Sequence, residues 1–136
     1  MVYDSRREVC VLFGGDQSLF DFSDLWEWDG VSWRKVPTIN EPGQRHDAAL
    51  AYDSDRGVIV LAGGRRSSPV TNYTDTWEYR PCVPDCERDC DLDVFDYLCF
   101  LDRFVNQSKY CDFERDGDLD IFDFLAFQNE FVEGCG

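Results

Sequence analysis

Two patterns of hydrophobic positions divide the chain near residue 81. Before that point, the apolar runs at residues 9–13 and 58–62 are short, rich in β-branched side chains and followed by glycine pairs. Runs of this length that end at turn residues predict buried β-strands. Residues 54–57 combine Ser, Asp and Gly and predict a hairpin turn between two strands.

After residue 84 the apolar positions follow a helical spacing instead. The first set is Val94, Tyr97, Leu98, Leu101, Phe104 and Val105, and the second is Ile121, Phe124, Leu125, Phe131 and Val132. A 3.6-residue period places each set on one face of a helix. The sequence therefore predicts two amphipathic helices. Pro84 disfavours helix at Val83, so we expect no helix in front of the first of them.

A regular series of acidic residues precedes each predicted helix. Between residues 112 and 123, acids occupy positions 1, 3, 5, 7, 9 and 12, and Gly117 occupies position 6. Alternating oxygen ligands around a sharp central turn are typical of a loop that wraps Ca²⁺. The same frame begins 27 residues earlier, at Asp85. Such a duplication favours a calcium-binding module.

We therefore predict two calcium ions, one in each loop. The predicted ligands are Asp85, Glu87, Asp89, Asp91, Asp93 and Asp96 in the first loop, and Asp112, Glu114, Asp116, Asp118, Asp120 and Asp123 in the second, with Asp91 and Asp118 acting through their carbonyl oxygens. Cys90 replaces the turn glycine of the first loop, and a non-glycine residue at positive φ is uncommon. We expect the first site to be weaker, or to be supported by a disulfide through Cys90. A solvated acidic tail is the alternative, but such tails lack this many aromatic residues.

The two loop-plus-helix units, closed by aspartate at position 12, resemble dockerin modules. Residues 120–129 and the end at Gly134-Cys135 are similar to the GC-type dockerin-like anchors of exported bacterial proteins. The resemblance implies a cohesin-like receptor or a cell-envelope component as partner. It also implies a disulfide between Cys82 and Cys135.

The same resemblance implies partner contacts at loop positions 10 and 11 and along the following helix. Val94 and Ile121 lie on the apolar stripe, and we expect both in the core. Phe95 and Phe122 lie off that stripe together with Asn129, and these three are the candidate partner-binding residues. The alternative is that the two Phe side chains pack against the other repeat or the preceding domain.

The first 80 residues contain a longer repeat. Residues 3–15 match residues 52–64 at an offset of 49, and residues 24–28 match residues 75–79. A period near 50 residues, with an apolar strand before Gly-Gly and a Trp/Tyr strand after it, resembles the kelch repeat. The resemblance implies seven strands, or about 1.75 blades of a kelch β-propeller.

The expected fold class is therefore multidomain: an all-β partial kelch β-propeller plus a small all-α dockerin-like module with two calcium loops. The expected boundaries are 1–80 for the kelch-repeat fragment, 81–84 for a linker and 85–136 for the dockerin-like module. Incomplete blades leave strand edges and sheet faces uncovered. We expect either a longer protein, with Met1 an internal or artificial start, or self-association through the incomplete blades.

The charge is concentrated in the second module. Residues 82–136 contain 15 acids and 4 bases, a net charge of −11 out of the −15 of the whole chain. Bound calcium would offset this self-repulsion. No basic stripe suggests nucleic acid as a partner. No apolar run approaches the length of a membrane span, so we expect no transmembrane segment.

Six of the seven cysteines follow residue 81, and this density predicts disulfides in a secreted or cell-surface protein whose signal peptide is not in this chain. Beyond the pair implied by the resemblance, Cys90 can pair with Cys86 or with Cys111. A zinc site is the rival interpretation, but four-residue cysteine spacings among many carboxylates favour calcium and disulfides. Cys10 lies within a predicted strand and is expected to be a buried free thiol.

Little in the sequence predicts catalysis. The single histidine, His46, lies in a segment resembling a kelch strand, where a structural role is expected, and no nucleophile motif accompanies it. We expect a non-enzymatic protein in which a calcium-binding anchoring or protein-interaction module follows a kelch β-propeller. One alternative is the C-terminal fragment of an exported carbohydrate-active enzyme whose catalytic part is missing. Another is a calcium-stabilised structural module without a receptor.

Overall fold

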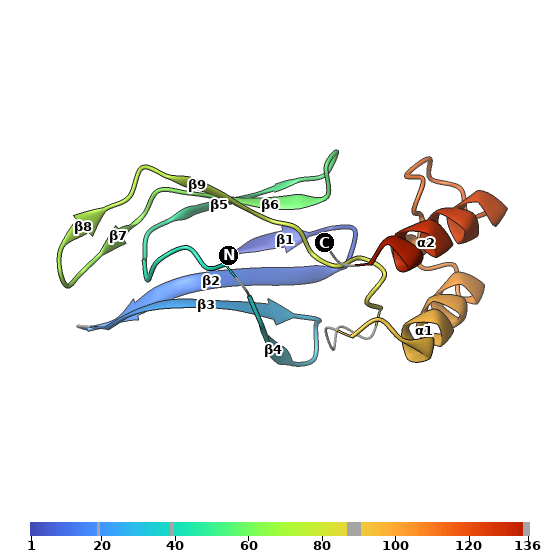
Figure 1. Cartoon of the computed structure of the whole chain (residues 1–136), viewed down its shortest axis with the longest axis horizontal. Helices are drawn as coiled ribbons and strands as arrows, with labels where there is room; N and C mark the ends of the chain where they lie inside the picture. The colour runs from blue at the N-terminus through green and yellow to red at the C-terminus, as the bar shows by residue number, and fades with distance from the viewer. Residues whose placement is uncertain (19, 39, 87–90, 135–136) are drawn as a thin grey trace. The chain divides into compact units, whose positions relative to one another are not determined.

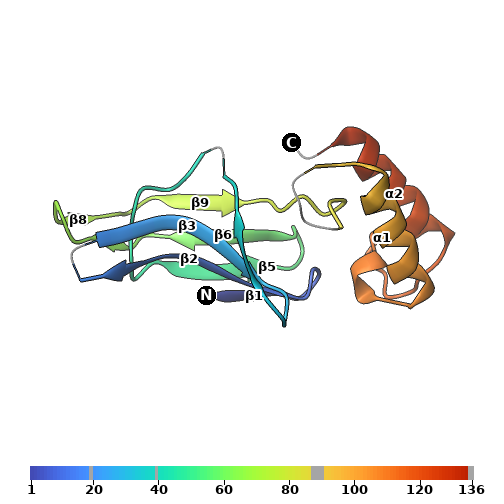
Figure 2. The same cartoon turned by 90° about the horizontal axis from the view of Figure 1, so that it is seen from below.

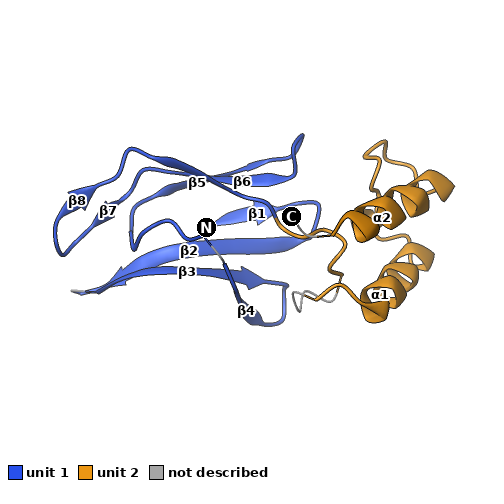
Figure 3. Ribbon diagram, viewed as in Figure 1, with its two compact units in different colours: residues 1–80 blue, residues 81–136 orange. Residues whose placement is uncertain are grey.

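The chain forms two compact units, residues 1–80 and residues 81–136 (Figure 3). The computed structural model describes residues 1–18, 20–38, 40–86 and 91–134. Within these residues the first unit contains the β-strands and the second contains the α-helices (Figure 1). None of the described helices is long and apolar enough to cross a membrane.

The first sheet of unit 1 is antiparallel and has the strand order β1-β2-β3-β4. Its strands are β1 (Val2–Asp4), β2 (Val9–Gln17), β3 (Phe20–Trp28) and β4 (Trp33–Val36). The strand predicted at residues 9–13 is confirmed, but β2 continues through the glycine pair, with a register shift between Phe13 and Gly15. Gly14 has φ of +61°, and a Cβ there would collide with the Arg45 carbonyl oxygen. Glycine is therefore required at this position.

The second sheet has the order β5-β6-β9, and a separate two-stranded ribbon extends from it. The sheet strands are β5 (Ala49–Asp53), β6 (Val58–Ala62) and β9 (Thr76–Tyr79), and the ribbon strands are β7 (Arg65–Arg66) and β8 (Thr71–Asn72). The predicted turn at residues 54–57 is confirmed, because it joins β5 to β6 and the Gly57 N–H donates to the Asp53 carbonyl oxygen at 2.8 Å.

The two sheets of unit 1 lie as layers that share one hydrophobic core (Figures 1 and 2). The first sheet contributes Val2, Val9, Val11, Phe13, Leu25 and Val36, and the second contributes Leu50, Tyr52, Ile59, Leu61, Trp77 and Tyr79. Because neighbouring residues of a strand point to opposite faces, each sheet uses only one of its faces in this core.

The expected fold class is wrong. A propeller needs repeated four-stranded sheets around a central axis. The described residues instead give one four-stranded sheet, one three-stranded sheet and a two-stranded ribbon, nine strands in place of the expected seven. The two sheets pack face to face around a single core, and two short helices follow in unit 2. The chain is thus a mostly β protein with a small helical unit. The core of unit 1 is formed by contacts between its two sheets.

Unit 2 contains the helices α1 (Val94–Val105) and α2 (Ile121–Glu133), with the short 3-10 helix η1 (Lys109–Cys111) between them. Both helices begin with a capping box, in which an aspartate at the N-cap accepts from the backbone of the first turn and an aspartate at N3 accepts from the N-cap. Gln107 (φ 57°) and Gly134 (φ 79°) end the helices by leaving helical conformation.

Aromatic side chains form the core of unit 2. Phe100, Tyr110, Phe113 and Phe127 are buried there. Val83 belongs to the same core, and its carbonyl oxygen accepts a hydrogen bond from the Tyr110 hydroxyl.

The predicted helical stripes are only partly correct. Tyr97, Leu101, Phe104, Phe124 and Phe131 pack against the core as expected. Val94, Leu98, Val105, Ile121, Leu125 and Val132 are exposed instead. Phe100 and Phe127, which the predicted stripes omitted, occupy the centre of the contact between the helices. On each helix, the face that is buried therefore differs from the predicted stripe and is centred on Phe100 or Phe127.

Candidate metal-binding loops

The second predicted loop, residues 112–123, is held in a tight curve by the side chain of its first residue. The Asp112 carboxylate accepts hydrogen bonds from the backbone N–H groups of Asp116 and Gly117, both at 3.1 Å. Gly117 has φ of +90°, and nothing lies within 4 Å of the position that a Cβ would take. The positive φ predicted for position 6 is confirmed. Glycine is favoured there by backbone conformation and not by crowding.

Asp123, at loop position 12, links the two ends of the loop. Its buried carboxylate accepts from the backbone N–H of Glu114 at 3.1 Å and from that of Asp120 at 3.0 Å. Asp120 in turn accepts from the Phe122 N–H at 2.7 Å and caps α2. Both aspartates, which were predicted only as metal ligands, form the capping box of α2. The Asp-x-x-Asp spacing at the helix start was the signal for it.

The carboxylates of this loop influence one another electrostatically. Desolvation by the surrounding protein raises the pKa of Glu114, and the negative charges of Asp116, Asp120, Asp123 and Asp112 raise it further. Asp116 also accepts a hydrogen bond from the Asp118 N–H at 2.9 Å. The loop thus concentrates like charges that destabilise one another unless a cation offsets them.

The donor set of the loop fits a hard cation. It offers carboxylate oxygens and backbone carbonyls, which are the ligands that Ca²⁺ prefers, and no thiolate or imidazole. Within the described residues, however, no group of three or more His, Cys, Asp or Glu side chains is arranged so that it could hold a metal ion. The carboxylate oxygens of Asp112, Asp116 and Asp123 accept backbone N–H groups instead. Each of these oxygens keeps a second lone pair that could face a cation.

The first predicted loop repeats the geometry of the second where it can be compared. The Asp96 carboxylate accepts from the Asp93 N–H at 3.0 Å, as Asp123 does from Asp120, and Asp93 accepts from the Phe95 N–H at 2.7 Å. Asp85 is buried and Asp91 is exposed. The predicted ligands Glu87 and Asp89, and Cys90 at the turn position, lie outside the described residues.

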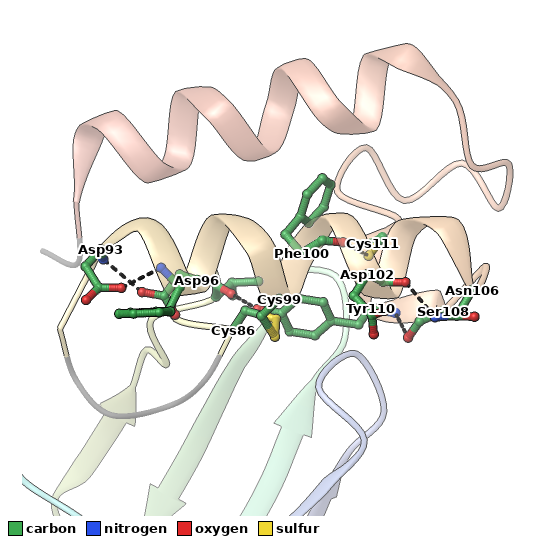
Figure 4. Close-up of a disulfide and its surroundings, with 12 residues drawn as sticks. Cys86, Asp93, Asp96, Cys99, Phe100, Asp102, Asn106, Ser108, Tyr110 and Cys111 are labelled. Atoms are coloured by element: carbon green, nitrogen blue, oxygen red, sulfur yellow. Dashed lines mark hydrogen bonds between the residues drawn. A yellow bond between two sulfur atoms is a disulfide. The ribbon is translucent and has the colours of Figure 1, made fainter.

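A disulfide joins the start of the first loop to α1. Cys86 is bonded to Cys99, 13 residues later, with a Cα–Cα distance of 5.9 Å (Figure 4). The predicted partner of Cys86 was Cys90, and Cys99 was not among the predicted disulfide cysteines. Cys99 lies six residues after Asp93, the N-cap of α1, and its nearness to Cys86 depends on where this helix begins.

The other cysteines differ in state. Cys82 takes part in a disulfide, and Cys135 lies outside the described residues. Cys111 is a free and buried thiol, contrary to its place among the disulfide candidates. Burial raises its pKa to about 12, so it is held as the neutral thiol. Cys10 is free as predicted, but it is half-buried and not fully buried.

The candidate partner-binding residues lie on the outer surface of the helices. Phe95 and Phe122 are 56% and 55% exposed, and Asn129 is exposed on α2. Val94 and Ile121, expected in the core, are 62% and 61% exposed. The reason is their position in the first helical turn, beyond the contact between Phe100 and Phe127. Both helices therefore begin with exposed apolar side chains at equivalent positions.

His46 is held by a hydrogen bond to Asp21. Its Nδ1 lies 2.6 Å from an oxygen of Asp21, whose other oxygen accepts from the Ser67 N–H at 2.8 Å. Burial opposes ionisation of Asp21, but the hydrogen bonds from Ser67 and His46 outweigh it and lower its pKa. This bond connects β3 with the segments around β7, a role in structure.

Comparison of the chain with models of known protein families, with curated proteins and with solved structures finds no match.

Proposed function

We propose that unit 2 is a calcium-dependent protein-interaction module of an exported protein. The observation that carries this proposal is the backbone of loop 112–123, curved around Asp112 and closed by Asp123, with Gly117 in the required conformation. The residues that would hold calcium are Asp112, Glu114, Asp116, Asp120 and Asp123 through carboxylates and Asp118 through its carbonyl oxygen. The equivalent acids from Asp85 to Asp96 would hold a second ion.

Charge neutralisation is the physical consequence of calcium binding here. Residues 82–136 carry a net charge of −11. Repulsion between these acids opposes the compact state, and a divalent ion in each loop would relieve it. Because Asp93, Asp96, Asp120 and Asp123 also cap the helices, calcium bound at these residues would stabilise α1 and α2 directly.

The exposed start of each helix supports an interaction role. α1 presents Val94, Phe95 and Leu98, and α2 presents Ile121, Phe122 and Leu125, all of them close to half exposed or more. Exposed apolar side chains gathered in this way are typical of surfaces that bind another protein. They favour a receptor, such as a cohesin-like domain or a cell-envelope component, over the alternative of a structural module without a partner.

The Cys86–Cys99 disulfide supports an exported location, because disulfides persist in oxidising compartments. The resemblance of residues 82–136 to dockerin-like anchors supports the same proposal. The alternative of a C-terminal fragment of a carbohydrate-active enzyme has no separate observation in its favour within the described residues.

Calcium titration of the full chain, followed by calorimetry and by circular dichroism at 222 nm, tests the proposal. We expect Ca²⁺ to bind and to raise the thermal stability of the helical signal. The double variant D112N/D116N should lose one binding event. D102N, which removes an exposed carboxylate outside the loops, should behave as the original chain. Absence of binding at millimolar Ca²⁺ would reject the proposal.

The interaction role is tested separately with a cohesin-type domain as probe. We expect binding in calcium that is lost in chelator and lost in the double variant F95D/F122D, while that variant still binds Ca²⁺. Calcium binding without any affinity for such a domain would favour the structural alternative.

A further inference from the structure

Unit 1 contains the same ionic network twice, once in each sheet. In the first sheet, Arg7 Nε lies 2.7 Å from Asp4 and its Nη1 lies 2.6 Å from Glu27. In the second sheet, Arg56 makes the same two contacts, at 2.7 Å with Asp53 and at 2.6 Å with Glu78. These residues are related by the offsets of 49 and 51 that relate the two halves of the unit.

The two networks differ in what covers them. Arg7 is 4% exposed, and the second sheet lies over it: the Tyr79 hydroxyl donates to Glu27 at 3.3 Å, and the Tyr79 ring lies 5.9 Å from the Arg7 guanidinium. Arg56 is 48% exposed. The first network is thus buried by an aromatic residue of the next sheet, and the second network lies open.

The surrounding apolar positions follow the same division. On the second sheet, the face that carries the open network also presents Ala49, Ala51, Val60, Ala62 and Thr76, and we call this set with Asp53, Arg56 and Glu78 the acceptor face. In the first sheet, the corresponding face carries Val2, Val11, Phe13 and Leu25 and is buried in the core. Ala49, Ala51 and Ala62 on this face are exposed, Val60 is half-buried, and Val58, which pairs with Asp53, is buried.

The other face of each sheet shows the reverse: it is buried in the second sheet and points away from the core in the first. The second sheet covers the first with Tyr52, Leu61, Trp77 and Tyr79. The equivalent residues of the first sheet are Tyr3, Leu12, Trp26 and Trp28, which point away from the core, and we call them the cover face. Tyr3 is 53% exposed, and the other three are half-buried. Each copy therefore presents one acceptor face and one cover face on the outside of unit 1. The core of unit 1 shows how the two equivalent faces pack on each other.

We propose that copies of this chain associate head to tail, with the cover face of one copy packed on the acceptor face of the next. The contact repeats the one between the two sheets of unit 1. Trp28 of one copy would lie over Arg56 and Glu78 of its neighbour, and its indole N–H would replace the Tyr79 hydroxyl as donor to the carboxylate. Because the two surfaces in the contact are different, the association extends into an open filament of copies or closes into a ring.

Charge complementarity also favours a second copy as the occupant. The acceptor face carries one guanidinium and two carboxylates. The cover face brings aromatic rings with polar edges, and beside Trp26 it carries the exposed Lys35 ammonium, which lies 3.8 Å from Asp24. At the equivalent place within unit 1, the aromatic residue Tyr79 contacts two of the three corresponding charges, Arg7 and Glu27. The proposal concerns unit 1 and does not depend on calcium binding by unit 2.

Sedimentation velocity of the full chain over a range of concentrations tests the proposal. The variant A51E places a charge on the acceptor face, and Y3E places one on the cover face. We expect each to weaken association by about 30-fold or more, because the added carboxylate would be buried without a partner. V70E, at an exposed position outside both faces, should associate as the original chain does. Circular dichroism checks that all three variants are folded.

Mixing the two interface variants distinguishes this arrangement from others. A51E retains its cover face and Y3E retains its acceptor face, so an equimolar mixture should form a one-to-one dimer that cannot extend. A mixture that stays monomeric would overturn the head-to-tail arrangement. The head-to-tail arrangement would also be overturned if the original chain stayed monomeric at all concentrations. It would be overturned, too, if A51E and Y3E each still associated alone, which would indicate contact through unit 2 or another surface.

Discussion

The rings of Phe100 and Phe127 stack in parallel, with centroids 3.9 Å apart and planes inclined by 5°. The two residues are 27 positions apart, the same offset that relates the two acidic loops. Each ring therefore packs on its own counterpart in the other repeat. Contact between equivalent residues is the property of an approximate two-fold axis, so the duplication visible in the sequence is also the symmetry of the core.

We expect F100A and F127A each to destabilise unit 2 by about 3–5 kcal/mol, because each removes a buried aromatic ring and leaves a cavity. Both described α-helices lie in unit 2, so circular dichroism at 222 nm during urea unfolding reports mainly on that unit. The four tryptophans all lie in unit 1, so tryptophan fluorescence reports on unit 1. F95A and F122A remove the same atoms at exposed positions of the same helices and should change the unfolding free energy by less than about 1 kcal/mol. Equal effects at all four positions would contradict the assigned core.

The two copies of the ionic network in unit 1 provide a second matched comparison. R7A removes the cation that pairs with the buried carboxylates of Asp4 and Glu27 and leaves Glu27 with the longer contact to Arg34 at 3.3 Å, and we expect a loss of about 3–5 kcal/mol. R56A removes the equivalent arginine from an exposed network and should cost about 1 kcal/mol or less. Tryptophan fluorescence during urea unfolding, at concentrations where the chain is monomeric, measures both. A similar loss in the two variants would show that burial does not separate the networks.

Acid should destabilise unit 1 through Asp75. Hydrogen bonds from the Arg45 guanidinium, at 2.6 and 3.0 Å, and from the Trp77 indole, at 2.7 Å, hold its pKa well below the usual range. A lowered native pKa stabilises the fold above about pH 4, and this contribution is lost as the pH falls toward the native pKa. We expect D75N to be less stable at pH 7 and to show a flatter decline in tryptophan-monitored stability between about pH 5 and 2. D16N, at an exposed position, should retain the original slope.

The free thiols should differ in reactivity. Because burial holds Cys111 as a thiol with a pKa of about 12, we expect it to resist iodoacetamide at pH 8 in the folded chain. Half-buried Cys10 should react first, and both should react in denaturant, as followed by mass spectrometry. A raised native pKa also predicts that unit 2 loses stability as the pH rises above about 8.5. Rapid labelling of Cys111 in the native state would contradict its burial.

Local features were predictable where short-range physics determines them. The β-branched runs at residues 9–13 and 58–62 and the turn at residues 54–57 form strands and a hairpin as expected, because alternating burial and turn chemistry act over a few residues. Gly117 adopts the positive φ that its place in the loop indicated. The duplicated loops and helices follow directly from a repeated sequence.

Features that depend on distant contacts were not predictable in the same way. Each helix carries apolar residues on two faces, and only the packing of Phe100 on Phe127 decides which face is buried. Val94 and Ile121 match the helical period equally well but lie beyond this contact. Likewise, a repeat near 50 residues identifies equivalent strands, but it does not determine that two sheets pack face to face. Cys99 was overlooked because its nearness to Cys86 depends on where α1 begins.

The Cys86–Cys99 disulfide has an informative counterpart. Shifted by 27 residues, its two positions become Phe113 and Ala126, which both belong to the apolar core of unit 2. One repeat thus closes with a covalent bond at the place where the other closes by burial of side chains. The covalent closure depends on an oxidant, so the first repeat is complete only once the chain has reached an oxidising compartment.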